Sequence, residues 1–163
     1  MAAPTAREID PLALEHQVCF ALATANRAVL AVYRPLLEPL GLTHPQYLVM
    51  LALWDHRTAP AADQFPLSVK QIAAALQMDS ATLSPMLKRL EAQGLITRAK
   101  NATDERTTDV MLTQRGIALR ERALAIPPAV VARLGVEVAE LENLHRVLTR
   151  INAAAVAAGA LQS

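Results

Sequence analysis

The segment that spans residues 68–113 constrains the fold more strongly than any other part of the chain. Ser68 and Gln71 have the spacing of a helix capping box, and apolar side chains then recur at helical intervals. A tight link at residues 77–79 separates this short helix from a second one, expected over residues 80–93. The pattern therefore predicts two short helices joined by a turn.

A hairpin is expected after these helices, because Gly94 ends the second helix and two strand-like runs follow it. The runs cover residues 95–100 and 108–113, and the polar residues 101–107 form the tip between them. Two short helices joined by a turn occur in many helical proteins. The added hairpin makes this order typical of a winged helix-turn-helix.

A long helix is expected before this module. Asp10 is a capping residue and Pro11 suits a first helical position, so the helix should begin there. Pro35 should kink or end the helix, and the Pro39 and Gly41 pair closes the segment.

Thr43 should cap the next helix, and residues 55–66 should form a loop because they contain two prolines and have mixed polarity. The buried face of this helix is expected to carry Tyr47, Leu48, Leu51 and Trp54.

Two helices are expected after the hairpin. Thr113 can cap the first, which the prolines at 127–128 interrupt, and the last should cover residues 137–158. Glu142 and Arg146 should form an outward ion pair at i, i+4. A short heptad seam consists of Leu141, Leu144, Leu148, Ile151 and Ala155.

Composition supports a mainly α chain with a small β-hairpin wing. The 163 residues suffice for one domain with a core, and the apolar fraction of 53% includes only 3% aromatic residues. Leu, Ala and Val must therefore fill the interior, and Leu and Ala favour helices. We expect a single domain over residues 1–163.

The chain is expected to be cytoplasmic and not bound to a membrane. No apolar run reaches the ~18 residues of a membrane span, and residues 1–9 do not resemble a signal peptide. Cys19 is the only cysteine, so an internal disulfide is excluded, which fits a reducing compartment.

The positive charge is concentrated on the expected helix-turn-helix and wing. Residues 1–63 carry four basic and six acidic side chains, whereas residues 64–122 carry nine basic and six acidic ones. The excess of three positive charges in the second segment is the electrostatic pattern expected of a DNA-binding surface.

The helix over residues 80–93 is the candidate for reading DNA. Leu83, Leu87 and Leu90 recur at helical spacing and should be buried, while Pro85 should make the first turn irregular. Hydroxyls near a helix start suit phosphates and base edges, and arginine suits the paired acceptors of guanine. An ordinary solvated face is the alternative. The candidate DNA-binding residues on this helix are Ser80, Thr82, Ser84, Lys88 and Arg89.

The hairpin adds Arg98, Lys100 and Arg106 to the candidate DNA-binding residues. A protruding arginine fits the narrow, negative minor groove, and Asp104 can hold Arg106 by a charge-assisted hydrogen bond. The alternative is a charged hairpin tip without a DNA-binding role.

These residues carry a resemblance to the MarR family of dimeric repressors, which implies a homodimer that binds a pseudo-palindromic operator in double-stranded DNA. The resemblance covers about residues 10–150 and implies dimerisation helices at 10–40 and 114–158 around a DNA-binding lobe at 43–113. The matching motifs are DSATLSPMLKRLEAQGLI (79–96), DER (104–106) and LTQRG (112–116).

Further motifs resemble the organic-hydroperoxide repressor subgroup (OhrR-like, with a single cysteine). They are LEHQVCF (14–20), YRPLL (33–37) and PQYL (45–48). The resemblance implies that Cys19 senses organic hydroperoxides and that tyrosines of the partner subunit, Tyr33 among them, donate hydrogen bonds to its sulfur. Two positions depart from this pattern, because His44 and Ala23 stand where tyrosines are usual.

The residues alone favour an inert core role for Cys19, because it lies in an apolar stretch, about two turns into the expected helix. His16 at i−3 is the nearest local donor, and a protonated His44 would favour the thiolate. The hypothesis from the resemblance is that peroxide converts Cys19 to a sulfenic acid. That acid would persist, condense with a low-molecular-weight thiol or attack a backbone nitrogen.

Three alternatives remain open. In the first, a small aromatic or phenolic ligand controls the repressor in place of oxidation. In the second, the chain is a thiol peroxidase. In the third, the chain is a pure interaction module that binds its partner through the seam of the last helix. A thiol peroxidase would need a resolving cysteine, which the chain does not have. No catalytic residue, cofactor or metal site is expected. The histidines that show no ligand or triad spacing are His16, His44, His56 and His145.

Overall fold

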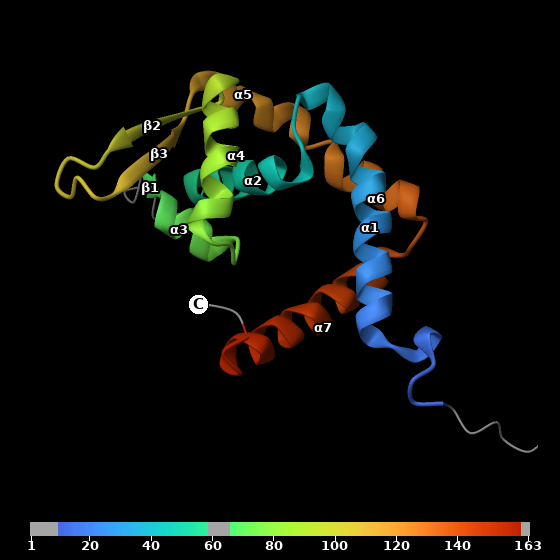
Figure 1. Cartoon of the computed structure of the whole chain (residues 1–163). Coiled ribbons are helices and arrows are strands. Elements are labelled where there is room, and N and C mark those ends of the chain that lie inside the picture. Colours follow the sequence, from blue (N-terminus) through green and yellow to red (C-terminus); the bar gives the residue numbers. More distant parts are fainter. Residues whose placement is uncertain (1–9, 59–65, 161–163) are drawn as a thin grey trace, which may run out of the picture.

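The computed structural model describes residues 10–58 and 66–160, and Figure 1 shows how their elements are arranged. The elements are the 3-10 helices η1 (Leu14–His16) and η2 (Glu38–Leu40), the helices α1 (Val18–Leu37), α2 (His44–Thr58), α3 (Val69–Ala75), α4 (Ser80–Ala92), α5 (Gln114–Ala123), α6 (Ile126–Leu134) and α7 (Val138–Ala157), and the strands β1 (Leu67–Ser68), β2 (Ile96–Lys100) and β3 (Thr108–Leu112).

The predicted winged helix-turn-helix is confirmed. Ser68 and Gln71 form the capping box of α3, in which the Gln71 backbone N–H donates to the Ser68 hydroxyl at 3.1 Å. Gln77 adopts a left-handed backbone conformation (φ 52°) in the turn between α3 and α4. Asp79 then caps α4, where its carboxylate accepts a hydrogen bond from the Thr82 backbone at 2.7 Å.

The wing contains one more strand than predicted. β2 and β3 pair antiparallel as expected, and β1 pairs with the other edge of β3, so the strand order is β1-β3-β2. A two-residue strand has no periodicity of its own, because it exists only through its partner. β1 therefore had no recognisable signal in the sequence.

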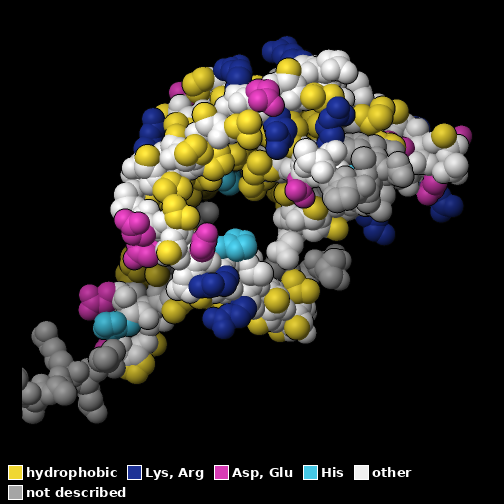
Figure 2. All heavy atoms as spheres, turned by 180° about the vertical axis from the view of Figure 1, so that it is seen from behind, with side chains coloured by type: hydrophobic (Ala, Val, Ile, Leu, Met, Phe, Trp, Pro, Cys, Tyr) yellow, Lys and Arg dark blue, Asp and Glu magenta, His cyan; other side chains and the backbone are white. Residues whose placement is uncertain are grey.

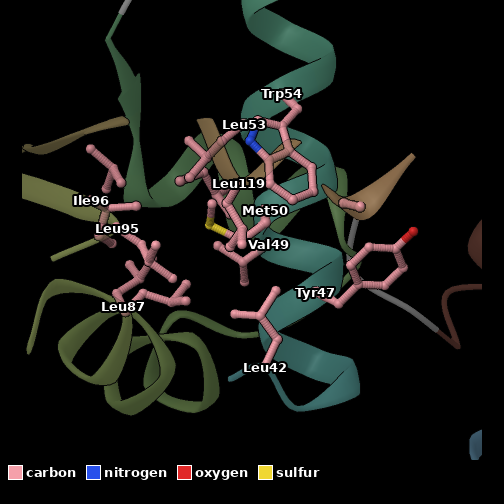
Figure 3. Packing of buried hydrophobic residues seen from close by; sticks show 14 of the residues in the cluster. Leu42, Tyr47, Val49, Met50, Leu53, Trp54, Leu87, Leu95, Ile96 and Leu119 are labelled. Carbon is pink, nitrogen blue, oxygen red and sulfur yellow. The ribbon is translucent and has the colours of Figure 1, made fainter. Parts of the chain in front are cut away.

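α2 and α4 contribute to one core cluster together with α3, the strands, α5 and α6, and α4 supplies Leu83, Leu87 and Leu90 as predicted, each fully buried. The predicted buried face of α2 was partly wrong, because Leu51 is 40% exposed and Leu48 is only half-buried. Tyr47 and Trp54 are buried as expected. The residues that complete the buried side of α2 are Val49, Met50 and Leu53 (Figure 3). α2 also extends to Thr58, so the predicted loop begins later than residue 55, and its residues 59–65 lie outside the described part.

The start of the first long helix also differs from the prediction. The Asp10 carboxylate accepts a hydrogen bond from the Leu12 backbone at 2.9 Å within a turn, and η1 follows that turn. Gln17 is extended (φ −83°, ψ 119°), so α1 begins only at Val18. Pro35 lies within α1 without ending it, and Gly41 (φ 71°) closes the segment as expected.

α1 packs along α6, whereas α7 projects from the rest of the molecule (Figure 1). The predicted range of α7 is confirmed, yet none of its described side chains is buried. In the space-filling view an opening lies between α7 and the rest of the molecule (Figure 2). The predicted Glu142–Arg146 pair is not formed among the described residues; Arg146 donates to Asn143 Oδ1 at 3.3 Å instead. No described helix combines the length and the apolar character needed to cross a membrane.

Candidate nucleic-acid interface and cysteine site

The exposed side of α4 carries most of the predicted DNA-binding residues. Ser80, Thr82, Lys88 and Arg89 are exposed and Ser84 is half-buried, while the leucines on the opposite side anchor the helix in the core. Among the ion pairs of the described residues, neither cation of α4 takes part. Both remain available for phosphates or base edges.

Pro85 does not disturb the start of α4. The helix is continuous from Ser80, directly after its cap Asp79, although an irregular first turn was expected. Thr82 donates its hydroxyl to Asp79 Oδ2 at 2.7 Å, and these hydrogen bonds lower the pKa of the Asp79 carboxyl. The Thr82 hydroxyl therefore already serves the cap, and Pro85 follows it inside the helix.

A groove of about 380 Å³ separates α4 from the wing and brings several of the predicted residues together. We call it the wing groove. Lys70 of α3 belongs to it and was absent from the predicted set, although a lysine on the first helix of a helix-turn-helix was a usable signal. The polar residues that line the wing groove are Lys70, Ser80, Ser84, Arg98, Arg106, Thr107 and Thr108.

Arg98 is engaged within the protein. Its Nε donates to Glu91 Oε2 at 3.0 Å, its Nη2 contacts the same oxygen, and its backbone nitrogen donates to Glu91 Oε1 at 3.2 Å. These interactions lower the pKa of Glu91, with the side-chain hydrogen bond from Arg98 as the largest cause. Lys100, by contrast, is exposed.

The wing tip is organised by two short polar side chains. Asn101 Oδ1 accepts from the Thr103 and Asp104 backbone nitrogens at 2.9 and 3.0 Å, and Asn101 Nδ2 donates to Asp109 at 2.8 Å. Asp104 Oδ1 accepts from the Arg106 backbone at 3.0 Å and lies 3.8 Å from its Nε. Asp104 therefore orders the loop beneath Arg106, whose side chain is 98% exposed.

The thiol site differs from the local arrangement expected. Because α1 begins at Val18, Cys19 lies in its first turn and is exposed. His16 belongs to η1, beyond the extended Gln17, so the expected i−3 relation within one helix is wrong. His16 Nε2 instead lies 3.8 Å from Glu15 Oε1.

Tyr33 and His44 lie together, but not beside Cys19 of the same chain. Their rings meet edge-to-face with centroids 5.0 Å apart, and Tyr47 lies 6.1 Å from Tyr33. Cys19 and Tyr33 share the continuous helix α1, so a rise of 1.5 Å per residue separates them by roughly 21 Å. Any contact between these groups therefore requires a second subunit.

Burial determines the charge state of the aromatic cluster. It lowers the pKa of His44 and raises the pKa of Tyr33 and Tyr47, so the neutral forms are favoured. A charged imidazolium beside the sulfur, as considered from the sequence, is therefore disfavoured. Neutral His44 retains one N–H donor.

A second cleft, of about 210 Å³, lies between α2 and the α5–α6 segment. Tyr47 and Trp54 provide aromatic walls, and Arg120 and Asp55 provide the charged groups. This cleft is separate from the wing groove, with which it shares no residue.

The chain is similar to known regulators over most of its length. A family model described as MarR family matches residues 42–108. The organic hydroperoxide resistance transcriptional regulator of Bacillus subtilis (strain 168) is 44% identical over 124 residues, which are 76% of this chain and 79% of that protein.

Solved structures show the same fold. Reduced AbfR bound to DNA is 30% identical, with a TM-score of 0.70 over 86% of this chain and 91% of that chain. Disulfide-formed AbfR gives a TM-score of 0.57 at the same identity, over 86% and 88% of the two chains. Bordetella bronchiseptica BpsR, whose DNA binding is regulated by 6-hydroxynicotinic acid, is 25% identical with a TM-score of 0.74, over 88% and 98%.

These relatives bear out the resemblance seen in the motifs of α4, the wing and the α1–α2 region, and the one compared at 44% identity is a transcriptional regulator rather than a peroxidase. A winged helix-turn-helix with an exposed, cationic α4 accounts for the DNA-binding role physically. The chain belongs to the MarR family of DNA-binding transcriptional regulators.

Proposed function

We propose that the chain is a homodimeric repressor that releases its operator when an organic hydroperoxide oxidises Cys19. The observation that carries this proposal is the position of Cys19, which is exposed in the first turn of α1, beside the exposed apolar side chains of Val18, Phe20 and Leu22. Similarity to the organic hydroperoxide resistance regulator supports the choice of oxidant.

Exposed apolar side chains on α1 and α7 support the homodimer. Leu37 is the only described residue of α1 that is buried, and α7 buries none. A soluble monomer rarely leaves such faces uncovered, and two-fold pairing would cover the same face on both subunits. The exposed apolar residues include Val18, Phe20, Leu22, Val138, Leu144 and Ile151.

Dimerisation would also complete the thiol site. Tyr33 lies roughly 21 Å along α1 from Cys19 of the same chain, and His44 of α2 contacts Tyr33. Antiparallel pairing of the two α1 helices could bring both side chains to the sulfur of the partner subunit. Backbone N–H groups of the first turn of α1 are unpaired within the helix and favour an anionic sulfur nearby.

The oxidation is a two-electron step. The Cys19 thiolate attacks one peroxide oxygen, an S–O bond forms, the O–O bond breaks, and the second oxygen leaves as an alcohol after it takes up a proton. A small cellular thiol would then displace water from the sulfenic acid and form a mixed disulfide. Cys19 is the only cysteine, so no resolving cysteine exists within the chain.

The added group would lie between packed helices and alter the relative position of the two DNA-binding lobes. The TM-score is 0.70 to reduced AbfR bound to DNA and 0.57 to disulfide-formed AbfR, and we propose a DNA-bound arrangement of this kind for the reduced dimer. In this state two α4 helices would lie about one DNA turn apart on a pseudo-palindromic operator.

The test is a DNA titration with wild type and Cys19→Ser, before and after addition of cumene hydroperoxide, with intact mass measured on the same samples. The probe is a duplex that the wild-type protein selects from a random pool. We expect wild type to gain one oxygen per chain and lose affinity, while Cys19→Ser binds and ignores peroxide. Release of the duplex from Cys19→Ser by peroxide would refute the redox proposal.

The second cleft favours one other candidate function, control by a small aromatic acid. Tyr47 and Trp54 can stack on an aromatic ring, and Arg120 can pair with a carboxylate. BpsR provides a relative whose DNA binding answers to such a molecule. Release of DNA by 6-hydroxynicotinic acid from wild type, but not from Arg120→Ala, together with insensitivity to peroxide, would establish this candidate instead.

A further inference from the structure

We propose that Glu91 is a positioning residue that holds the wing against the DNA-reading helix, and that Arg98 acts on DNA through this clamp and not by direct contact. The inference rests on the proposed mode of DNA binding, in which α4 and the wing bind together. It assigns a role to Glu91 that its negative charge alone would not suggest, because an acidic group near a phosphate backbone weakens binding.

The clamp connects the end of α4 with the middle of β2 by three contacts. Both Nε and Nη2 of Arg98 contact Glu91 Oε2, and the Arg98 backbone nitrogen donates to Glu91 Oε1. A guanidinium that contacts a carboxylate by two nitrogens is held in direction as well as in distance.

The backbone contact explains why the clamp acts on the whole strand. Among the described strands β2 pairs only with β3, so its outer edge has N–H groups to which none of these strands is bound. Arg98 lies at the centre of β2, and its N–H points to Glu91. A side chain of α4 thus satisfies a strand-edge group that a neighbouring strand would otherwise bind.

Exposure separates Arg98 from the wing arginine that can reach DNA. The Arg98 side chain is 23% exposed and Glu91 is 36% exposed, whereas Arg106 is 98% exposed. Both arginines line the wing groove, but only Arg106 projects freely from it. The Arg98 guanidinium would have to break its contacts with Glu91 before all of its N–H groups could bind a DNA phosphate.

The direction of β2 determines where the wing tip places Arg106. Asn101 donates its backbone N–H to the Thr107 carbonyl, so Arg106 lies about four strand residues beyond Arg98, which is roughly 13 Å at about 3.3 Å per residue. A tilt of about 10° at Arg98 would then move Arg106 by roughly 2 Å. That displacement exceeds the tolerance of a minor-groove arginine contact, which depends on hydrogen-bond distances.

The test compares Glu91→Gln, Arg98→Met and the double variant with wild type, on the duplex that wild type selects from a random pool. Glu91→Gln removes a negative charge and keeps the shape of the side chain. A purely electrostatic role predicts tighter binding of this variant, whereas the clamp predicts binding weakened by about tenfold. The matched control is Glu105→Gln, which removes an exposed charge of the same wing and should bind as well as wild type or more tightly.

The dependence of affinity on salt separates the clamp from a direct contact. The slope of log Kd against log salt should be unchanged for Arg98→Met and reduced by about one for Arg106→Ala. The effects of Glu91→Gln and Arg98→Met should not add in the double variant. Thermal melts of all variants verify that they are folded.

Two results would overturn the inference. One is affinity of Glu91→Gln equal to or above that of wild type; the other is a salt slope of Arg98→Met reduced by about one, which would assign a phosphate contact to Arg98. Failure of wild type itself to select any duplex would refute the proposed DNA-binding mode, and is therefore distinguishable from failure of the clamp.

Discussion

Single side chains of the wing and of the adjacent end of α4 divide into those that organise the wing and those that are free to contact DNA. Asn101, Asp104 and Glu91 make hydrogen bonds within the protein, whereas Arg106 projects into solvent. Arg98 and Arg106 looked equivalent in the sequence, yet Arg98 is bound to Glu91 and Arg106 is not. Exposure and existing partners distinguish them.

Arg106→Ala should weaken binding to the selected duplex by about 1–3 kcal/mol and reduce the preference for A·T pairs where the wing enters. The reason is the loss of an almost fully exposed cation, whose ion-pair partner Asp104 is itself exposed. Anisotropy titrations with duplexes that differ in the flanking base pairs would measure both effects. Arg133→Ala, which removes an exposed cation from α6, is the control and should leave that preference unchanged.

His44 should make folding stability depend on pH. Burial lowers the pKa of His44 in the folded state, so the unfolded chain binds more protons as the pH falls below about 6.5. The contribution of the neutral imidazole is complete above that pH and is lost as the pH decreases toward the folded-state pKa. Urea titrations between pH 7.5 and about 5 should show a smaller decrease for His44→Asn than for wild type. Parallel curves for the two proteins would contradict this account.

At the level of elements, the wing and α5 are in close backbone contact at Gly116. Trp54 of α2 donates its ring N–H to the Gly116 carbonyl at 2.9 Å, and a Cβ at Gly116 would lie 2.1 Å from the Leu95 carbonyl oxygen. Because that oxygen belongs to the backbone, it cannot rotate away. The junction joins the DNA-binding lobe to the helices proposed for dimerisation.

Gly116→Ala should therefore destabilise the fold by about 3 kcal/mol or more, although the same change inside an unhindered helix stabilises by about 1 kcal/mol. The sign of the change in unfolding free energy decides the matter. A stabilised Gly116→Ala protein would show that the wing and α5 are not in close contact.

Signals that are local in sequence predicted the elements well. The capping residues Ser68 and Thr113 were recognisable because each acts on a neighbour three residues ahead. The start of α1 was not, because Asp10 forms a turn instead and the extended Gln17 interrupts the helical path. The Glu91–Arg98 clamp and β1 depend on tertiary contacts, which one sequence does not reveal.

For the candidate site, the exposed face of α4 and the projecting Arg106 were predictable because helical spacing and a hairpin tip determine exposure. The position of Cys19 at the helix start was not, since it depended on where α1 begins. No local pattern predicted that Cys19 and Tyr33 of one chain lie far apart. The subgroup resemblance did, because it implied that Tyr33 contacts Cys19 of the partner subunit.

Over the whole molecule, the apolar side chains that no described element covers determine the expected assembly. Leu144 and Ile151 of the predicted heptad seam are 50% and 43% exposed, and α7 runs below the DNA-binding lobe and apart from it (Figure 1). In the proposed dimer, Leu144 and Ile151 would be buried in the interface between the two subunits.

Leu144→Asp should convert the dimer to a monomer and weaken operator binding by at least tenfold, because each lobe would then bind a half-site alone. Sedimentation velocity would measure the mass and anisotropy the affinity. Asn152→Asp, which adds the same charge at an exposed polar position of α7, should remain dimeric. A wild-type protein that sediments as a monomer would refute the assembly.

The coupling between the sulfur and the DNA-binding lobes is tested most directly by the distance between the two α4 helices of a dimer. A nitroxide attached to p-acetylphenylalanine in place of exposed Ala92, the last residue of α4, reports this distance by pulsed electron resonance without use of Cys19. We expect one maximum in the reduced dimer, a displaced maximum after cumene hydroperoxide, and no displacement in Cys19→Ser. An unchanged distance in wild-type protein that mass measurement shows to be oxidised at Cys19 would contradict the account.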